Sequence, residues 1–74
     1  MDMKQLREKL NLRTVDVASR LNIGESTIRS WEKGRAVPRY EQIRPLMNLY
    51  EISFEQLEEA INEARRKNVD AQSL

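Results

Sequence analysis

The stretch Leu12–Gly34, LRTVDVASRLNIGESTIRSWEKG, decides the fold of this chain. Its apolar residues recur every three or four positions in two runs, which is the period of an amphipathic α-helix. Asn22, Ile23 and Gly24 lie between the runs, and asparagine and glycine favour the backbone of a tight corner. Ala18 is small enough for two crossing helices to approach each other there. The stretch therefore predicts two short helices joined by a turn, the second with its polar side outward.

Two short helices joined in this way form a helix-turn-helix. Matches to a wider pattern extend over the chain from about residue 3 to 61. They are Leu6-Arg7-Glu8, Ala18, Leu21, Ile23, Ser26-Thr27-Ile28, Trp31-Glu32, Gly34, Pro38 and Ile52-Ser53-Phe54-Glu55-Gln56-Leu57. In these residues the chain resembles the lambda-repressor-like (Cro/CI-type) helix-turn-helix family. The resemblance implies an all-α bundle of five helices that binds operator DNA, usually as a dimer.

Length and composition limit the function classes. Seventy-four residues are enough for one domain, which we assign to residues 1–67, followed by a C-terminal tail at 68–74 that we expect to fray. The chain has no cysteine and no histidine, so thiolate metal sites, disulfides and the commonest general base are absent. We therefore expect no metal, no cofactor and no enzymatic activity. The N-terminus lacks a signal peptide pattern, and no segment is apolar enough to span a membrane, which is compatible with a cytoplasmic location.

The charge is unevenly distributed along the chain. Residues 1–39 hold nine Lys/Arg and five Asp/Glu, whereas residues 40–74 hold four Lys/Arg and seven Asp/Glu. The basic half contains the helix-turn-helix. A basic surface of this kind suits contact with phosphates, although charge alone is equally typical of an ordinary solvated helix surface. Together with the motif, the asymmetry favours a DNA-binding face.

Helical periodicity predicts five helices. We expect them at residues 2–10, 14–21, 25–33, from about 39 onward, and after Ser53. Phe54, Leu57 and Ile61 should form the apolar stripe of the last helix. Two residues depart from the family pattern: Pro45 predicts a kink or break near Arg44, and Glu51 stands where the family often has glycine in a left-handed conformation.

The second helix of the motif carries the candidate base-reading residues. Because Ile28 and Trp31 point inward, the side chains that face outward belong to Glu25, Ser26, Arg29 and Ser30. The N-terminal part of such a helix approaches base edges in the major groove. Residues 25, 26 and 30 match base-contacting positions of the family, and Arg29 is near enough to join them. Arginine can bind guanine O6 and N7 with two hydrogen bonds.

Glu25 admits two interpretations. A carboxylate that faces DNA is repelled by phosphates, yet it can accept a hydrogen bond from cytosine N4. Alternatively, Glu25 only interacts with the positive end of its own helix dipole.

Phosphate contacts are expected around the same helix. Thr14 stands where the family often has glutamine, near the DNA backbone, and its hydroxyl can donate to a phosphate. Lys33, Arg35 and Arg39 surround the end of the helix and the following loop, and should meet the phosphates of the opposite strand. Such contacts orient the protein without reading sequence.

Arg7 and Glu32 match a family pair that joins the first helix to the end of the third. A guanidinium and a carboxylate can form two parallel hydrogen bonds, so we assign this pair a structural role.

These observations predict a sequence-specific DNA-binding transcriptional regulator whose partner is double-stranded DNA. We expect a homodimer, at least on DNA, because one small domain makes few base contacts. The dimer interface should lie around the last helix and the chain before it. This region has more apolar residues than one small core needs, namely Met47, Tyr50, Ile52 and Val69. An antitoxin or an adaptor that binds protein through the same fold is the alternative. The acidic second half and Glu25 favour that alternative.

Overall fold

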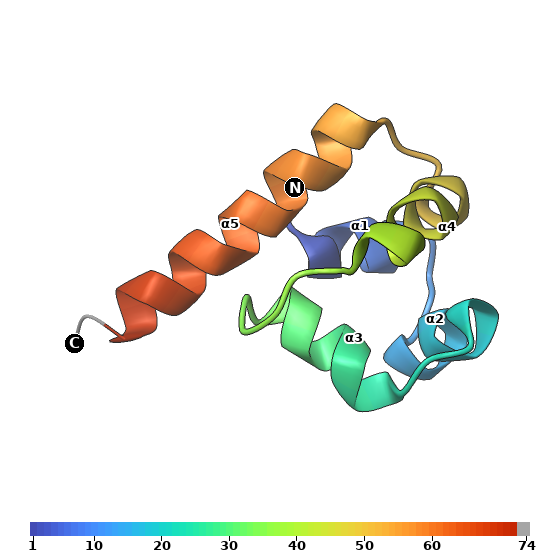
Figure 1. The fold of residues 1–74 in the computed structure, drawn as a ribbon, viewed down its shortest axis with the longest axis horizontal. Helices are drawn as coiled ribbons and strands as arrows, with labels where there is room; N and C mark the ends of the chain where they lie inside the picture. The colour runs from blue at the N-terminus through green and yellow to red at the C-terminus, as the bar shows by residue number, and fades with distance from the viewer. Residues whose placement is uncertain (73–74) are drawn as a thin grey trace.

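The computed structural model describes the backbone of residues 1–72 and the side chains of residues 1–68. This part of the chain forms five helices and no strand, which confirms the all-α prediction (Figure 1). The helices are α1 (Met3–Lys9), α2 (Thr14–Leu21), α3 (Glu25–Glu32), α4 (Tyr40–Tyr50) and α5 (Phe54–Gln72). α5 is the longest and contacts α1, α3 and α4, while α2 packs against α3 and α4.

The helix ends follow local sequence signals. Asp2 caps α1: its carboxylate accepts from the Gln5 amide, and the Gln5 side chain accepts from the Asp2 amide. Ser53 and Gln56 form the same reciprocal pair at the start of α5. These contacts use backbone donors that a helix start leaves without intrahelical partners. Both starts therefore lie within one residue of their predicted positions.

The corner of the motif depends on Asn22 rather than Gly24. Asn22 has a φ of 56° and ends α2 in the left-handed conformation, whereas Gly24 begins α3 with a φ of −72°. The Ile23 amide donates to the Ala18 carbonyl over 3.0 Å, which closes the end of α2. Asparagine tolerates the left-handed region better than most residues, so the turn forms without glycine at that position.

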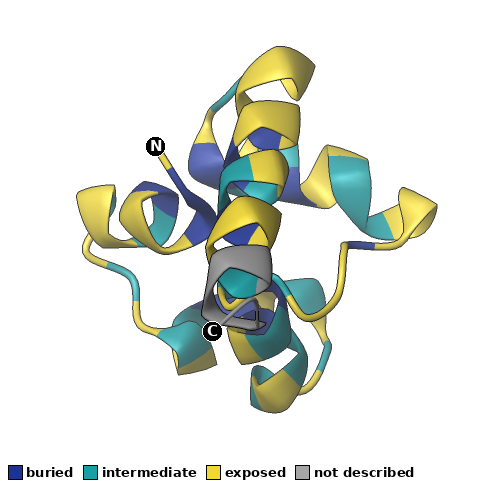
Figure 2. Cartoon of the chain, turned by 90° about the vertical axis from the view of Figure 1, so that its left-hand side faces the viewer, coloured by how far each residue is buried: buried dark blue, intermediate teal, exposed yellow. Residues whose placement is uncertain are grey.

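The core is a single cluster formed by all five helices. Residues that bury nearly all of their surface are Met3, Leu6, Val17, Ala18, Ile28, Trp31, Leu46, Tyr50, Leu57, Ala60 and Ala64. Buried positions recur along the inward sides of the helices, and exposed positions cover the outer sides (Figure 2). Small alanines on α5 allow the backbones of neighbouring segments to come close to it.

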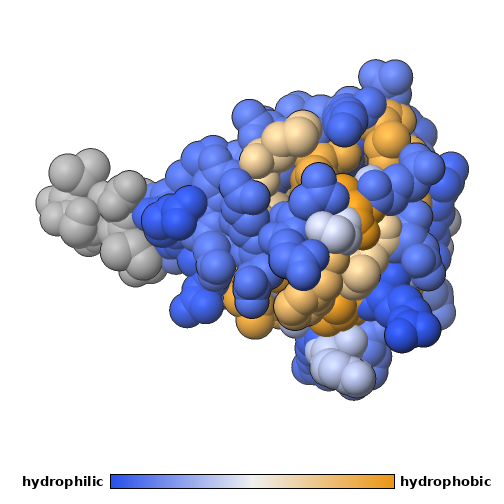
Figure 3. Space-filling view, turned by 90° about the horizontal axis from the view of Figure 1, so that it is seen from above, coloured by the Kyte–Doolittle hydropathy of each residue, from blue (hydrophilic) through white to orange (hydrophobic). Residues whose placement is uncertain are grey.

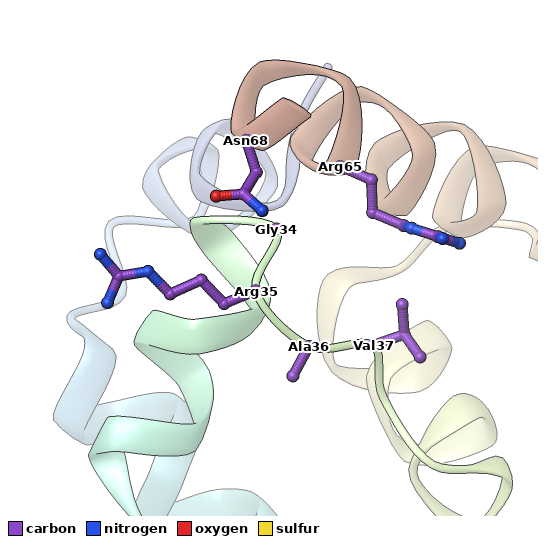
Figure 4. Close-up of a pocket in the computed structure, with 6 residues that line it drawn as sticks. All are labelled: Gly34, Arg35, Ala36, Val37, Arg65 and Asn68. Carbon is purple, nitrogen blue, oxygen red and sulfur yellow. The ribbon is translucent and has the colours of Figure 1, made fainter. Parts of the chain in front are cut away.

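Gly34 lies where the loop after α3 crosses α5 (Figure 4). Its φ of 75° lies in the left-handed region. A Cβ added to Gly34 would lie 2.2 Å from the Ala64 carbonyl oxygen, so the two backbones leave no room for a side chain. Glycine is therefore required for both conformation and space.

Two expectations differ from the structure. Of the kink or break predicted near Arg44, the break is wrong: α4 runs without interruption through the exposed Pro45. Phe54 was wrongly assigned to the core: it is 49% exposed, since it is the first residue of α5 and precedes the turn that reaches the core at Leu57. α5 continues to Gln72. Residues 73 and 74 of the expected tail lie outside the described residues.

Candidate nucleic-acid interface

α3 is anchored by its inner side and presents its outer side. Ile28 and Trp31 are almost completely buried in the core. Ser26 and Arg29 are exposed, while Glu25 and Ser30 are half-buried. The amphipathic pattern of eight residues thus orients the helix, because only one rotation about its axis buries both large apolar side chains. All four candidate base-reading residues lie outside the core.

Glu25 connects two other candidate residues. Its Oε1 accepts from the Thr14 hydroxyl over 2.6 Å and from a terminal guanidinium nitrogen of Arg29 over 2.7 Å. A threonine hydroxyl has one proton, and here that proton is donated to Glu25. The Thr14 hydroxyl is thus engaged within the protein, whereas its backbone amide lies in the first turn of α2, where amides have no intrahelical acceptor.

One flank of α3 faces α1 and the start of α2. A cavity of about 280 Å³ opens there, lined by Lys4, Arg7, Thr14, Arg29, Glu32 and Lys33. Four of these side chains are cationic and one is anionic, which suits an anion. Lys4 was not predicted from the sequence, because only the packing of α1 against α3 brings it to this flank.

The opposite flank of α3 faces the loop and α4. Arg39, which caps α4, lines a cavity of about 360 Å³ together with Thr27 and Trp31 of α3. Arg35 lies in the loop and its side chain extends away from Arg65 of α5, although both residues line one cavity of about 330 Å³ (Figure 4). Lys33, Arg35 and Arg39 are all exposed. Cations therefore border α3 on both flanks.

Arg7 and Glu32 join α1 to the last residue of α3. Arg7 Nε and Nη2 donate to the two carboxylate oxygens of Glu32 over 2.7 and 3.1 Å, and Nη1 donates to the Leu12 carbonyl over 2.9 Å. The side chains of the pair are only 11% and 8% exposed. The hydrogen bonds that Arg7 donates to Glu32 raise the pKa of the Arg7 guanidinium. This geometry suits a structural contact better than a contact with DNA.

Tyr50 is a buried neighbour of this pair. Burial raises the pKa of its phenol, and the nearby Glu32 carboxylate raises it further. Among the described residues, no group hydrogen-bonds to the buried Tyr50 hydroxyl. The core behind α3 therefore contains a buried hydroxyl whose position depends on packing rather than on a hydrogen bond within the described residues.

The described residues contain no cluster of three or more acidic side chains arranged to hold a metal ion. Along the same part of the chain, no helix has both the length and the apolar character needed to cross a membrane.

Residues 2–60 match the model of the family described as "Helix-turn-helix domain". No curated protein and no solved structure shows a significant match to the chain. The family match covers most of the chain and includes α1 to α4 and the first turns of α5. The chain therefore belongs to the helix-turn-helix domain family.

Proposed function

We propose that this helix-turn-helix protein is a sequence-specific transcriptional regulator of the lambda-repressor-like (Cro/CI-type) kind. It binds operator DNA with α3 in the major groove and then occludes or recruits the polymerase. The observation that carries this proposal is the surface of α3: an outward polar row, anchored from behind by Ile28 and Trp31 and bordered on both flanks by cations. A helix that enters a groove meets phosphates on both sides, so this arrangement matches duplex DNA.

The proposed contact residues divide into one group for base edges and one for phosphates. Ser26, Arg29 and Ser30 reach the base edges, where hydrogen bonds distinguish one base pair from another, and Glu25 lies beside Arg29 in this group. The contacts with the DNA phosphates come from Lys33, Arg35 and Arg39 and from the start of α2 at Thr14. Lys4 joins them because it lines the same cavity as Thr14 and Lys33. These contacts set the register of the protein on the duplex.

A salt titration tests the phosphate contacts. The logarithm of the binding constant should fall linearly with the logarithm of salt concentration, with a slope of about −0.9 per phosphate neutralised. Replacing Lys4, Lys33 or Arg35 with alanine should weaken binding to all sequences and reduce the slope by about one. Arg66→Ala is the control, since Arg66 is an exposed cation on α5.

Equal slopes for the wild type and all three variants would contradict the proposed face. Failure of the wild type to select any sequence from a random duplex pool, together with tight binding to a protein partner, would favour the antitoxin or adaptor function instead.

We further propose that the protein forms a homodimer, at least on DNA, through a surface formed by Tyr40, Ile43 and Met47 of α4 and Phe54 of α5. These residues line a cavity of about 460 Å³. Tyr40 is 92% and Phe54 49% exposed, which is unusual for large aromatic side chains. Apolar side chains gather over the half of the molecule that holds α4 and the start of α5, whereas the half toward the C-terminus is hydrophilic (Figure 3).

Charge supports a second copy of the chain as the partner. Glu41 and Arg44 line the same cavity, so a suitably oriented two-fold axis can bring Glu41 of one copy near Arg44 of the other. This surface replaces part of the one expected from sequence. Tyr50 is buried in the core, Met47 and Ile52 are half-buried, and the Val69 side chain lies outside the described side chains.

Analytical ultracentrifugation with and without a selected duplex tests the dimer. The wild type should place two protomers on each complete high-affinity site, and Phe54→Glu should place one, with lower affinity. Asn62→Glu is the control because it adds the same charge two turns farther along α5. A single wild-type protomer on a complete site, or unchanged stoichiometry in Phe54→Glu, would exclude this interface.

A further inference from the structure

Glu25 lies between two side chains that the sequence assigned to different tasks. Its Oε1 accepts hydrogen bonds from Thr14, expected to contact a phosphate, and from Arg29, expected to read a base. Thr14 begins α2, Glu25 begins α3, and Arg29 lies one turn farther along α3. The network therefore connects both helices of the motif at the surface that faces DNA.

The hydrogen bond from Thr14 distinguishes this network from an ordinary helix surface pair. A glutamate and an arginine four residues apart on an exposed helix interact weakly by themselves. Here the Thr14 hydroxyl donates to the same oxygen from a second helix, which restrains the carboxylate in one direction. Since that carboxylate accepts from Arg29, the restraint extends to the guanidinium.

The other N–H groups of Arg29 can donate to a second acceptor. A guanidinium has five N–H groups, and the contact with Glu25 uses a terminal nitrogen only. A bidentate contact with guanine O6 and N7 needs two N–H groups. Because Arg29 is already held by Glu25, its side chain loses less rotamer freedom when it binds DNA. The positive charge of Arg29 also offsets the repulsion between the Glu25 carboxylate and DNA.

We propose that Glu25 is a positioning residue: it holds the Arg29 guanidinium, supported by Thr14, in the conformation that reads a base pair. This inference rests on the proposed function, in which α3 reads DNA. It differs from the direct role, in which Glu25 accepts a hydrogen bond from cytosine. A positioning residue changes discrimination at the base pair read by Arg29, whereas a direct reader changes it at a base pair of its own.

Base-pair discrimination separates the two roles. The wild type first selects its preferred sequence from a random duplex pool, and binding is then measured on every single-base variant of that sequence. Glu25→Ala should reduce discrimination at the same base pair as Arg29→Ala, by at least about fivefold, because one bidentate arginine contact provides that much or more. The double variant should lose no more than Arg29→Ala alone. Glu25→Gln, which keeps an oxygen acceptor for both donors, should lose less than Glu25→Ala.

Two variants of Thr14 test the support from α2. Thr14→Val removes the hydroxyl at nearly constant shape and should reduce discrimination at the base pair read by Arg29, whereas Thr14→Ser should restore it. Glu55→Ala is the matched control, since Glu55 is an exposed acidic residue in the first turn of α5. Loss of discrimination at a separate base pair in Glu25→Ala, additive with that of Arg29→Ala, would overturn the positioning role.

NMR of the free protein provides a readout that needs no DNA. The Arg29 guanidinium should show slow N–H exchange and restricted rotation in the wild type, and both should approach values of a solvated arginine in Glu25→Ala. Equal Arg29 signals in the two proteins would overturn the inference. If the wild type selects no sequence from the pool, both the proposed function and the inference fail. If it selects one but the Glu25 and Arg29 effects fall on different base pairs, only the inference fails.

Discussion

Replacing Arg7 with alanine removes three hydrogen bonds from a largely buried site. Arg7 donates to both oxygens of Glu32 and to the Leu12 carbonyl, and neither charged side chain is more than 11% exposed. The variant leaves the Glu32 carboxylate buried without its counterion. Breaking a buried ion pair in this way costs about 3–5 kcal/mol, compared with about 0–1 kcal/mol for an exposed pair.

This cost is large for a domain of this size. Typical stability is about 0.05–0.15 kcal/mol per residue, which corresponds to about 4–11 kcal/mol for 74 residues. A domain of 60–100 residues loses about 4–8 °C of melting temperature per kcal/mol. We therefore expect Arg7→Ala to melt at least 12 °C below the wild type, that is about 3 kcal/mol at 4 °C each, or to be unfolded at 37 °C.

Urea denaturation monitored by circular dichroism and by fluorescence of Trp31, the single and buried tryptophan, measures the effect. The double variant Arg7→Met/Glu32→Met should recover much of the loss, because it leaves no buried charge unpaired. A loss below about 1 kcal/mol in Arg7→Ala would refute the reasoning, since that is the value of an exposed pair. Additive losses in the double variant would refute it as well.

Three further perturbations test the backbone and the termini. Gly34→Ala should destabilise the fold by about 2–4 kcal/mol in urea denaturation, because φ is 75° and the new Cβ would lie 2.2 Å from a backbone oxygen of α5. The control Gly24→Ala should cost less than about 1 kcal/mol. Glu51→Gly should stabilise by about 0.5–1 kcal/mol by relieving the left-handed φ of 56°; a lower melting temperature would contradict this strain. Burial raises the pKa of the Asp2 carboxyl, but hydrogen bonds from Lys67 and from the Gln5 amide outweigh burial and lower the pKa overall. The stability that Asp2 adds should therefore be complete above about pH 4 and be lost as pH falls through the lowered pKa. The stability difference between the wild type and Asp2→Asn, measured from pH 7 to pH 2, should shrink only at the acidic end.

The sequence by itself determined the features that depend on near neighbours in the chain. The spacing of Ile28 and Trp31 decided which side of α3 faces the core, because positions three or four apart share one side of a helix. The cap at Ser53 and the left-handed turn at Gly34 were predictable for the same reason, since each depends on a few consecutive residues. These signals were sufficient to identify five helices and the outward row of α3.

Only the tertiary structure decided what lies opposite each side of a helix. Lys4 reaches the flank of α3 because α1 packs there. Phe54 remains exposed because the buried residues of α5 begin about one turn farther along, at Leu57. The contacts of Glu25 with Thr14 and Arg29 require the exact approach of α2 to α3. Periodicity gives the direction of a side chain relative to its own helix axis, whereas distances between helices depend on how their side chains interlock. For this reason the candidate residues could be named from the sequence, but the connections among them could not.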